Sequence, residues 1–173
     1  MTKTEANLRA AFAGESQARN KYDYYAKVAE KEGYNYIAKV FSSIALNEHQ
    51  HAKDEFKKIN GIGTTEENLQ DAIEGEHYEE SSMYPAFAKE ADEEGNEEAA
   101  KLFRAIAKVE IEHEKRYIKL LELLKSGNVF KREIAINWKC AKCGHTHNGT
   151  QPPEQCPSCK HARNYFEPED IQI

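Results

Sequence analysis

The sequence contains two copies of a Glu-x-x-His motif, one formed by Glu48 and His51 and the other by Glu110 and His113. Each copy lies in a long stretch whose apolar residues follow a helical period. A spacing of three residues places the two side chains of each pair on one helix face, about one turn apart. That face is otherwise apolar in both copies. Burying an unpaired carboxylate and imidazole there would cost several kcal/mol, so a bound metal ion is the economical explanation.

Further carboxylates occupy similar positions in two other helical segments. Glu15 lies on the apolar stripe of a helix expected over residues 4–31, and Glu76, with Glu79 one turn later, lies in a third helix. One Glu from each of two helices and Glu-x-x-His from each of two others is the ligand pattern of di-iron carboxylate bundles. Carboxylates are hard ligands that can bridge two cations, and imidazoles add neutral donors that suit iron. We therefore expect a dinuclear metal site.

The two motifs are related by an internal repeat. A shift of 62 residues superposes them and also places Tyr22 on Tyr84. Two copies of one helical hairpin pack naturally as a four-helix bundle with both motifs facing inward. We therefore expect a mainly α fold built from a duplicated helical hairpin. Tyr22 and Tyr84 lie about two turns beyond Glu15 and Glu76. These tyrosines could hydrogen-bond the ligands or carry transient oxidation, or they could be core tyrosines with satisfied hydroxyls.

The repeat is out of step by one residue in the third helix. Glu15 corresponds to Glu76 at an offset of 61, so one extra residue lies between Glu76 and Tyr84. A single insertion in a helix is usually absorbed as a π-bulge, which often marks a functional site. We predict such a bulge between Glu79 and Pro85, where the proline ring also disfavours a regular helix.

The remaining helix boundaries follow from glycines and capping residues. A second helix is expected over residues 35–59, after which Gly61 and Gly63 break the chain. Thr65 is expected to be the N-cap of a short linking helix that precedes the third helix. A fourth helix is expected over residues 96–125. The segment 129–137 is expected to be a strand or a linker into the tail.

All four cysteines lie in the C-terminal tail as two Cys-x-x-Cys pairs, Cys140 with Cys143 and Cys156 with Cys159. This spacing is a strong signal for tetrahedral Zn or Fe held by four thiolates. Disulfides carry little weight in a cytosolic chain. The spacing leaves open a structural zinc ribbon or an iron site that carries single electrons. The expected core over this site is Trp138, Tyr165 and Phe166, and the expected surface histidines are His145, His147 and His161.

The composition excludes several classes of protein. The 173 residues are 31% charged, with a net charge of −6, which argues against nucleic acid or an anionic membrane as the main partner. No apolar run approaches the roughly 18 residues of a membrane span, and the N-terminus lacks the pattern of a signal peptide. We therefore expect a cytoplasmic protein.

Nearly the whole chain resembles the rubrerythrin family, in four ligand segments and two cysteine knuckles: AFAGESQARNKY, ALNEHQHAK, EGEHYEESSMYPAFAKEA, KVEIEHEKRY, KCAKCG and CPSC. The resemblance implies a ferritin-like di-iron four-helix bundle over residues 1–128 and a linker over residues 129–136. A small C-terminal rubredoxin-like iron-binding domain with four cysteines would follow over residues 137–173. No ligand position departs from the family pattern.

The resemblance also implies a function and a role for each ligand. It implies a non-haem peroxidase that reduces hydrogen peroxide to water in oxidative-stress defence, with two irons in the bundle and one on the cysteines. Glu79 would bind the first iron in the oxidised state and give way to His51 in the reduced state, and Tyr22 and Tyr84 would support the ligands. The implied di-iron ligands are Glu48 and Glu110 as bridges, Glu15 and His51 on one iron, and Glu76 and His113 on the other.

The implied partners are a second copy of the chain and an external electron donor. In the family, the tetracysteine iron of one subunit of a homodimer lies near the di-iron site of the other. The donor would be a rubredoxin or an NAD(P)H-dependent reductase. Two alternatives remain open, a ferroxidase that handles iron and a binding module with a structural zinc ribbon. It also remains open whether the two hairpins of one bundle come from one chain, because the connection around Gly61 could allow helix exchange between protomers.

Overall fold

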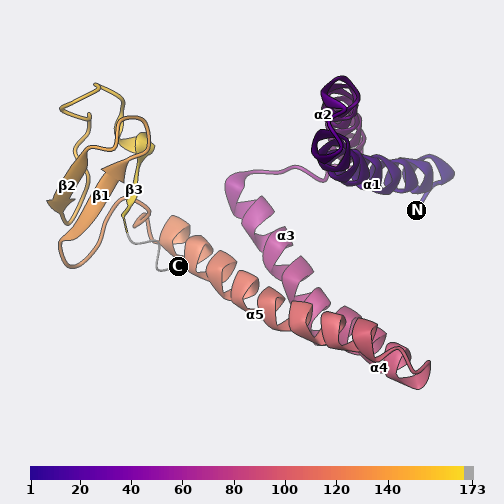
Figure 1. Cartoon of the computed structure of the whole chain (residues 1–173). Helices are drawn as coiled ribbons and strands as arrows, with labels where there is room; N and C mark the ends of the chain where they lie inside the picture. The colour runs from indigo at the N-terminus through magenta and orange to yellow at the C-terminus, as the bar shows by residue number, and fades with distance from the viewer. Residues whose placement is uncertain (170–173) are drawn as a thin grey trace. The chain divides into compact units, whose positions relative to one another are not determined.

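In the computed structural model, which describes residues 1–169, the chain divides after Gly63 into two compact units. The first unit is a hairpin of α1 (Lys3–Lys31) and α2 (Asn35–Lys58), which lie side by side (Figure 1). The buried residues of this hairpin are all alanines, so the two backbones approach closely: Ala26, Ala29, Ala38, Ala45 and Ala52. The boundaries of both helices agree with the sequence prediction to within a residue.

The helices of the second unit are α3 (Thr65–Tyr78), α4 (Tyr84–Glu93) and α5 (Glu97–Lys125). A π-helical turn, η1 (Glu79–Met83), joins α3 to α4, and the combined arm packs along α5 (Figure 1). The expectation of a separate linking helix before the third helix was therefore wrong. Its residues have no breaker after them, so α3 continues directly into the segment that carries Glu76.

The start of α3 is fixed by a capping box one residue earlier than the sequence suggested. The N-cap is Thr64, not Thr65. The Glu67 N–H donates to the Thr64 hydroxyl at 3.3 Å, and the Thr64 N–H donates to the Glu67 carboxylate at 2.7 Å. Because both bonds satisfy donors that a helix start leaves unpaired, they determine which of the two adjacent threonines ends the loop.

The π-helical turn confirms the predicted bulge. The Tyr84 N–H donates to the Glu79 carbonyl, five residues back. Pro85 follows immediately; it has no N–H and its ring would clash with the carbonyl four residues earlier in a regular helix. The wider turn accommodates both the proline and the extra residue. The corresponding part of α1 is α-helical throughout, so the two hairpins differ at this point.

The C-terminal part of the chain is a small antiparallel sheet with strand order β2-β1-β3. Its strands are β1 (Ile136–Cys140), β2 (Thr146–Gly149) and β3 (Phe166–Pro168), and a short helical turn, η2 (Arg163–Tyr165), precedes β3. Trp138 and Phe166 form the buried core with two of the cysteines, and Tyr165 packs against it. This core confirms the expected aromatic cover of the cysteine site. Residues 170–173 of the domain expected over 137–173 lie outside the described residues.

The helices were also compared with the length and polarity that a membrane span requires. Over residues 1–169, every helix is too short or too polar to span a bilayer.

Candidate metal centres

The first Glu-x-x-His motif forms a compact triad within the α1–α2 hairpin. Glu15 of α1 and Glu48 and His51 of α2 each bring one ligand atom to within 4.8 Å of the others. His51 Nδ1 lies 2.9 Å from Glu48 Oε2, as expected for residues one turn apart on a helix. A hydrogen bond with the Glu48 carboxyl, followed by desolvation and by the charge of Glu48, raises the pKa of Glu15.

The second motif forms a matching triad in the other unit. Glu76 of α3 joins Glu110 and His113 of α5 within the same 4.8 Å limit. His113 Nδ1 lies 2.6 Å from Glu110 Oε2 and 3.6 Å from Glu76 Oε2. Glu110 is buried, with 9% of its surface exposed. Burial, followed by the hydrogen bond with Glu110 and its charge, raises the pKa of Glu76.

The electrostatics of both triads suit a bound cation. In each triad two carboxyl groups lie close enough to hydrogen-bond, and the proton that this bond requires is reflected in the raised pKa of Glu15 and of Glu76. A metal ion among these oxygens would replace the proton and remove the repulsion between carboxylates. Carboxylate and imidazole donors together suit iron. The residues present therefore fit the metal that the sequence pattern predicts.

An aromatic trio lies in each hairpin, so the duplication extends beyond the ligands. Within each trio the ring centroids lie 5.6 to 6.4 Å apart. The trios are Tyr22, Tyr25 and Phe41 in the first hairpin and, 62 positions later, Tyr84, Phe87 and Phe103 in the second. Burial, followed by the charges of Glu79, Glu110 and Glu76, raises the pKa of Tyr84. The Tyr84 hydroxyl is therefore protonated at neutral pH and close to the second triad.

Glu79 occupies the first position of the π-helical turn. Within residues 1–169, the groups of ligand atoms that lie within 4.8 Å of one another do not include Glu79. Its charge nevertheless helps to raise the pKa of both Glu76 and Tyr84. Glu79 therefore lies near the second triad without being part of it.

A third group of possible ligands and one further carboxylate were not anticipated from the sequence. His77 Nδ1 lies 3.4 Å from Glu80 and 3.1 Å from Glu114, which forms a third group of possible ligands. Glu55 has a buried carboxylate oxygen without a hydrogen-bond partner among the described residues, and its charge contributes to the raised pKa of Glu15. The position of Glu55, seven residues after Glu48 on the same helix face, could have indicated its proximity. Contacts between helices, such as His77 with Glu114, leave no signal in a helical period.

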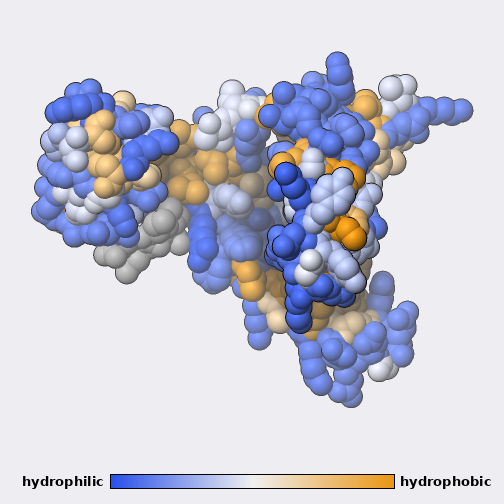
Figure 2. Space-filling view, turned by 45° about the horizontal axis from the view of Figure 1, so that its top comes forward, coloured by the Kyte–Doolittle hydropathy of each residue, from blue (hydrophilic) through white to orange (hydrophobic). Residues whose placement is uncertain are grey.

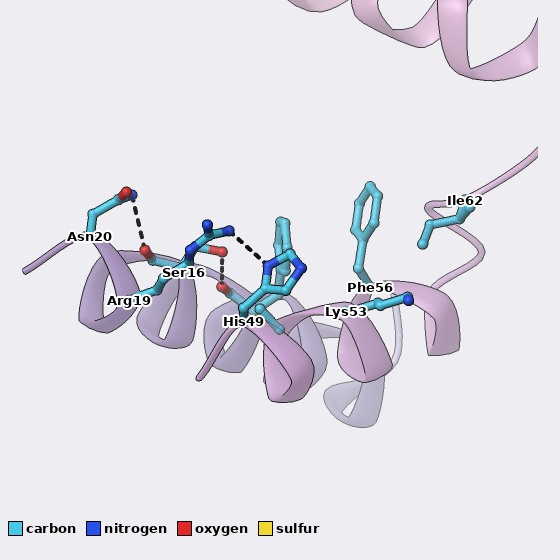
Figure 3. A pocket seen from close by; sticks show the side chains of 9 residues that line it. Ser16, Arg19, Asn20, His49, Lys53, Phe56 and Ile62 are labelled. Atoms are coloured by element: carbon cyan, nitrogen blue, oxygen red, sulfur yellow. Dashed lines mark hydrogen bonds between the residues drawn. The ribbon is translucent and has the colours of Figure 1, made fainter. Parts of the chain in front are cut away.

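A groove on the α1–α2 hairpin lies beside the first triad but does not contain its ligands. Its volume is about 420 Å³, and Phe12, Arg19, His49, Phe56 and Ile62 are among its lining residues (Figure 3). Arg19 Nη1 lies 2.8 Å from His49 Nδ1. His49 thus belongs to the stripe of α2 next to the ligand stripe, as its position in the motif predicts.

The four cysteines form a site with tetrahedral spacing. Cys140 Sγ lies 3.7 Å from Cys159 Sγ, and Cys143 Sγ lies 3.7 Å from Cys156 Sγ. A disulfide would require about 2.05 Å. Metal–sulfur bonds of about 2.3 Å in a tetrahedron place the sulfur atoms about 3.8 Å apart. The observed separations therefore fit a single metal ion held by four thiolates.

Both cysteine pairs form the same backbone knuckle. The Gly144 N–H donates to the Cys140 carbonyl at 2.8 Å, and the Lys160 N–H donates to the Cys156 carbonyl at 2.9 Å. Lys160 has φ 63°, a conformation that favours glycine, which occupies the equivalent position 144. Burial opposes ionisation of Cys156, yet backbone N–H groups within the knuckle lower its pKa to about 7. This thiol is therefore prepared to act as a metal ligand.

His161 is a surface residue, as expected, and it also contacts one of the cysteines. It is exposed, but its Nδ1 lies 3.3 Å from Cys159 Sγ, within hydrogen-bond distance of a ligand sulfur. The imidazole can therefore influence the charge on that sulfur.

These features together define a class of protein. Matching Glu–Glu–His triads on helical hairpins, followed by a four-cysteine site in a small sheet, characterise a di-iron carboxylate protein with a rubredoxin-type iron domain. A family model described as Rubrerythrin matches residues 6–121, and one described as "Rubrerythrin, rubredoxin-like domain" matches residues 138–167. The chain belongs to the rubrerythrin family. Its cofactors are accordingly a di-iron centre and one rubredoxin-type iron.

Curated relatives match along nearly the full chain. The "Putative rubrerythrin" of Methanocaldococcus jannaschii is 45% identical over 96% of this chain and 93% of its own length. The rubrerythrin of Porphyromonas gingivalis is 47% identical over 96% of this chain and 90% of its own length. The nigerythrin of Nitratidesulfovibrio vulgaris is 33% identical, with coverages of 94% and 85%. These matches confirm the mainly α, ferritin-like fold with a small rubredoxin-like domain.

Proposed function

We propose that this protein reduces hydrogen peroxide to water and so protects the cell against oxidative stress. The observation that carries this proposal is the presence, in one chain, of two matching Glu–Glu–His triads and a four-thiolate site. A simple electron carrier would not need the triads, and an iron store would not need the cysteines. The combination suits an oxidoreductase that receives electrons at one metal site and uses them at another.

The proposed ligand assignment follows the two triads. Glu48 and Glu110 would hold both irons. Glu15 and His51 would complete one iron, whereas Glu76 and His113 would complete the other. The cysteine-bound iron would use Cys140, Cys143, Cys156 and Cys159. When bound, two irons in this site would supply the two electrons needed to break the O–O bond, and an iron on the cysteines would return electrons one at a time.

Residues of the chain would manage the protons of this reaction. Reduction of one peroxide to two waters consumes two protons. Bound irons would replace the protons that Glu15 and Glu76 share with neighbouring carboxyl groups, so the protons for the reaction would come from groups outside the ligand set. The protonated hydroxyl of Tyr84 lies near the second triad and can donate a hydrogen bond to a carboxylate or to the substrate. Tyr22 would serve the first triad in the same way.

We further propose that Glu79 is a ligand that changes with redox state. It lies one turn from Glu76, in the π-helical turn, and its charge acts on Glu76 without forming part of the triad. His51 is the more exposed histidine, with 57% of its side chain accessible compared with 41% for His113. Exchange of Glu79 for His51 on one iron would adjust the charge of the site to that of the metal.

The proposed organisation follows from these roles. The di-iron bundle would span residues 1–128 and the rubredoxin-like domain residues 137–173, joined by residues 129–136. The protein would act as a homodimer in which the cysteine-bound iron of one subunit serves the di-iron centre of the other. Its electrons would come from a rubredoxin or an NAD(P)H-dependent reductase. Thiolate ligands require reduced cysteines, which fits a cytoplasmic location.

A peroxide titration of the anaerobically reduced protein tests the proposed activity. The visible spectrum should show the red ferric tetrathiolate returning as peroxide is added, with one peroxide consumed for each pair of electrons. A colourless protein would indicate a zinc ribbon. Faster turnover with oxygen and Fe(II) than with peroxide would indicate a ferroxidase instead.

A further inference from the structure

We propose that each di-iron centre is shared by two copies of this chain. The α1–α2 hairpin of one copy would pair with the α3–α5 helices of the other. This inference rests on the di-iron centre of the proposed function and adds to it a partner, a second copy that supplies half of the ligands. It follows from the length of the connection between α2 and α3.

The connection is short and is held at both ends. The N–H groups of Asn60 and Gly61 donate to carbonyl groups in the last turn of α2, at 3.1 and 2.9 Å. Ile62 then lines the groove beside the ring of Phe56 (Figure 3). At the other end, Thr64 is the N-cap of α3 and forms the capping box. Lengthening the connection would therefore break contacts that the structure makes.

A one-chain bundle of this fold requires a longer connection. A ferritin-like bundle contains one long crossover, which joins two helices that run in the same direction. For the triads to face each other, this crossover must run from the end of α2 back past the metal centre to the start of α3. Glu48 lies ten residues before Lys58, and Glu76 lies eleven residues after Thr65, which together correspond to about 32 Å of helix. The seven residue steps from Lys58 to Thr65 cover about 25 Å at most.

A second copy removes this conflict. When the hairpins pair between copies, the connection only has to pass from one bundle into its neighbour. A two-fold axis then produces two equal bundles, each with one complete set of ligands. Short hinge connections favour this kind of exchange.

Apolar side chains on the ligand stripe of α2 are partly exposed, and a partner would cover them. Ile37 and Ile44 lie on the same stripe as Glu48, yet they are 47% and 38% exposed. Apolar side chains lie among charged ones on the helical surface (Figure 2). The connection shows which partner fits this stripe, because the same chain cannot place its own second hairpin there.

Complementation between two variants tests the proposal. Glu48→Gln disables the first triad and Glu110→Gln disables the second, each with little change in shape. The two chains are co-expressed with different tags and the mixed dimer is isolated. If the centre is shared, one of the two centres in the mixed dimer receives two intact halves. We expect iron in the dinuclear centre to be near background in each parent variant and to recover to about half of the wild-type content in the mixed dimer.

In the matched control, a shared centre predicts loss of dinuclear iron, the opposite of its result in the first mixed dimer. A chain with both substitutions is co-expressed with the wild type, and the mixed dimer is isolated in the same way. A shared centre predicts that both centres are damaged and that dinuclear iron is lost. A centre built within one chain predicts that half of the iron remains. The red ferric tetrathiolate and the helical circular dichroism signal show that each variant has folded.

The iron content decides the arrangement separately from the activity. No recovery in the first mixed dimer, together with half the iron in the control, would overturn the shared centre. A wild-type protein that binds the irons but does not reduce peroxide would refute the proposed function and leave the shared centre in place.

Discussion

Deleting Ser82 should disable the second triad by removing the π-helical turn. The turn contains one residue more than a regular helix needs, so a chain shortened by one residue can continue as an α-helix from α3 into α4. With α4 held against α5, the α3 segment then rotates by about 100° and shifts by about 1.5 Å. A carboxylate about 5–6 Å from the helix axis moves by roughly 8 Å under this rotation.

This displacement is large compared with the geometry of the triad. Glu76 Oε2 now lies 3.6 Å from His113 Nδ1. A movement of roughly 8 Å removes Glu76, and Glu79 with it, from any shared metal. Loss of a residue that only hydrogen-bonds a metal ligand typically lowers metal affinity about 10- to 100-fold. Loss of a ligand should exceed this, so we expect the deletion variant to bind less than the full pair of irons.

Anaerobic Fe(II) titration measures the stoichiometry directly, and steady-state peroxide reduction measures the consequence. Ser82→Ala is the matched control, because it changes the same residue and keeps the helical register. The control should bind two irons and retain its rate. If the deletion variant binds two irons and turns over as the control does, the π-helical turn does not position the ligands and the reasoning is wrong.

Other predictions concern the bridges, the electron path and the cap of α3. Glu48→Ala or Glu110→Ala should abolish peroxide reduction in a coupled assay while the red ferric chromophore remains. Cys140→Ser should allow one rapid turnover of the prereduced protein in stopped flow but block the steady state. Thr64→Ala should cost about 1 kcal/mol, which corresponds to about 2–4 °C in Tm by calorimetry. The Thr64 backbone N–H, followed by its hydroxyl, lowers the pKa of Glu67, so the stabilisation by Glu67 should be present at neutral pH and disappear as acid protonates the carboxylate.

The sequence alone predicted the features that depend on the helical period and on the internal repeat. The stripes containing Glu48 and Glu110 recur at a fixed offset, and the structure places each in a triad with the Glu expected from the neighbouring helix. The extra residue before Tyr84 predicted the π-helical turn because the rest of the repeat provides an internal reference. The spacing of the cysteines likewise predicted that all four sulfur atoms meet at one site.

The sequence was insufficient where the outcome depends on contacts across the fold or on a choice between equal neighbours. Thr64 and Thr65 are chemically identical, and only the position of Glu67 relative to the folded turn selects the cap. The contact of His77 with Glu114 joins two helices whose relative rotation is not encoded in either period. His161 approaches Cys159 Sγ because the backbone of the second knuckle turns back after Cys159. The spacing of the cysteines does not predict this contact.

The two hairpins differ at the position one turn after the first Glu of each triad, and this difference bears on function. In the first hairpin, the residue one turn after Glu15 is Ala18, so α1 offers no carboxylate at that position, and the nearby Glu55 belongs to α2. In the second hairpin, the corresponding position holds Glu79, and the π-helical turn that begins with it exists only on that side. An exchange that uses the carboxylate one turn after the Glu of a triad can therefore occur only with Glu79 of the second hairpin. If the centre is shared between copies, the exchange between Glu79 and His51 would link residues of two different chains, and the redox state of the irons would act directly on the contact between subunits.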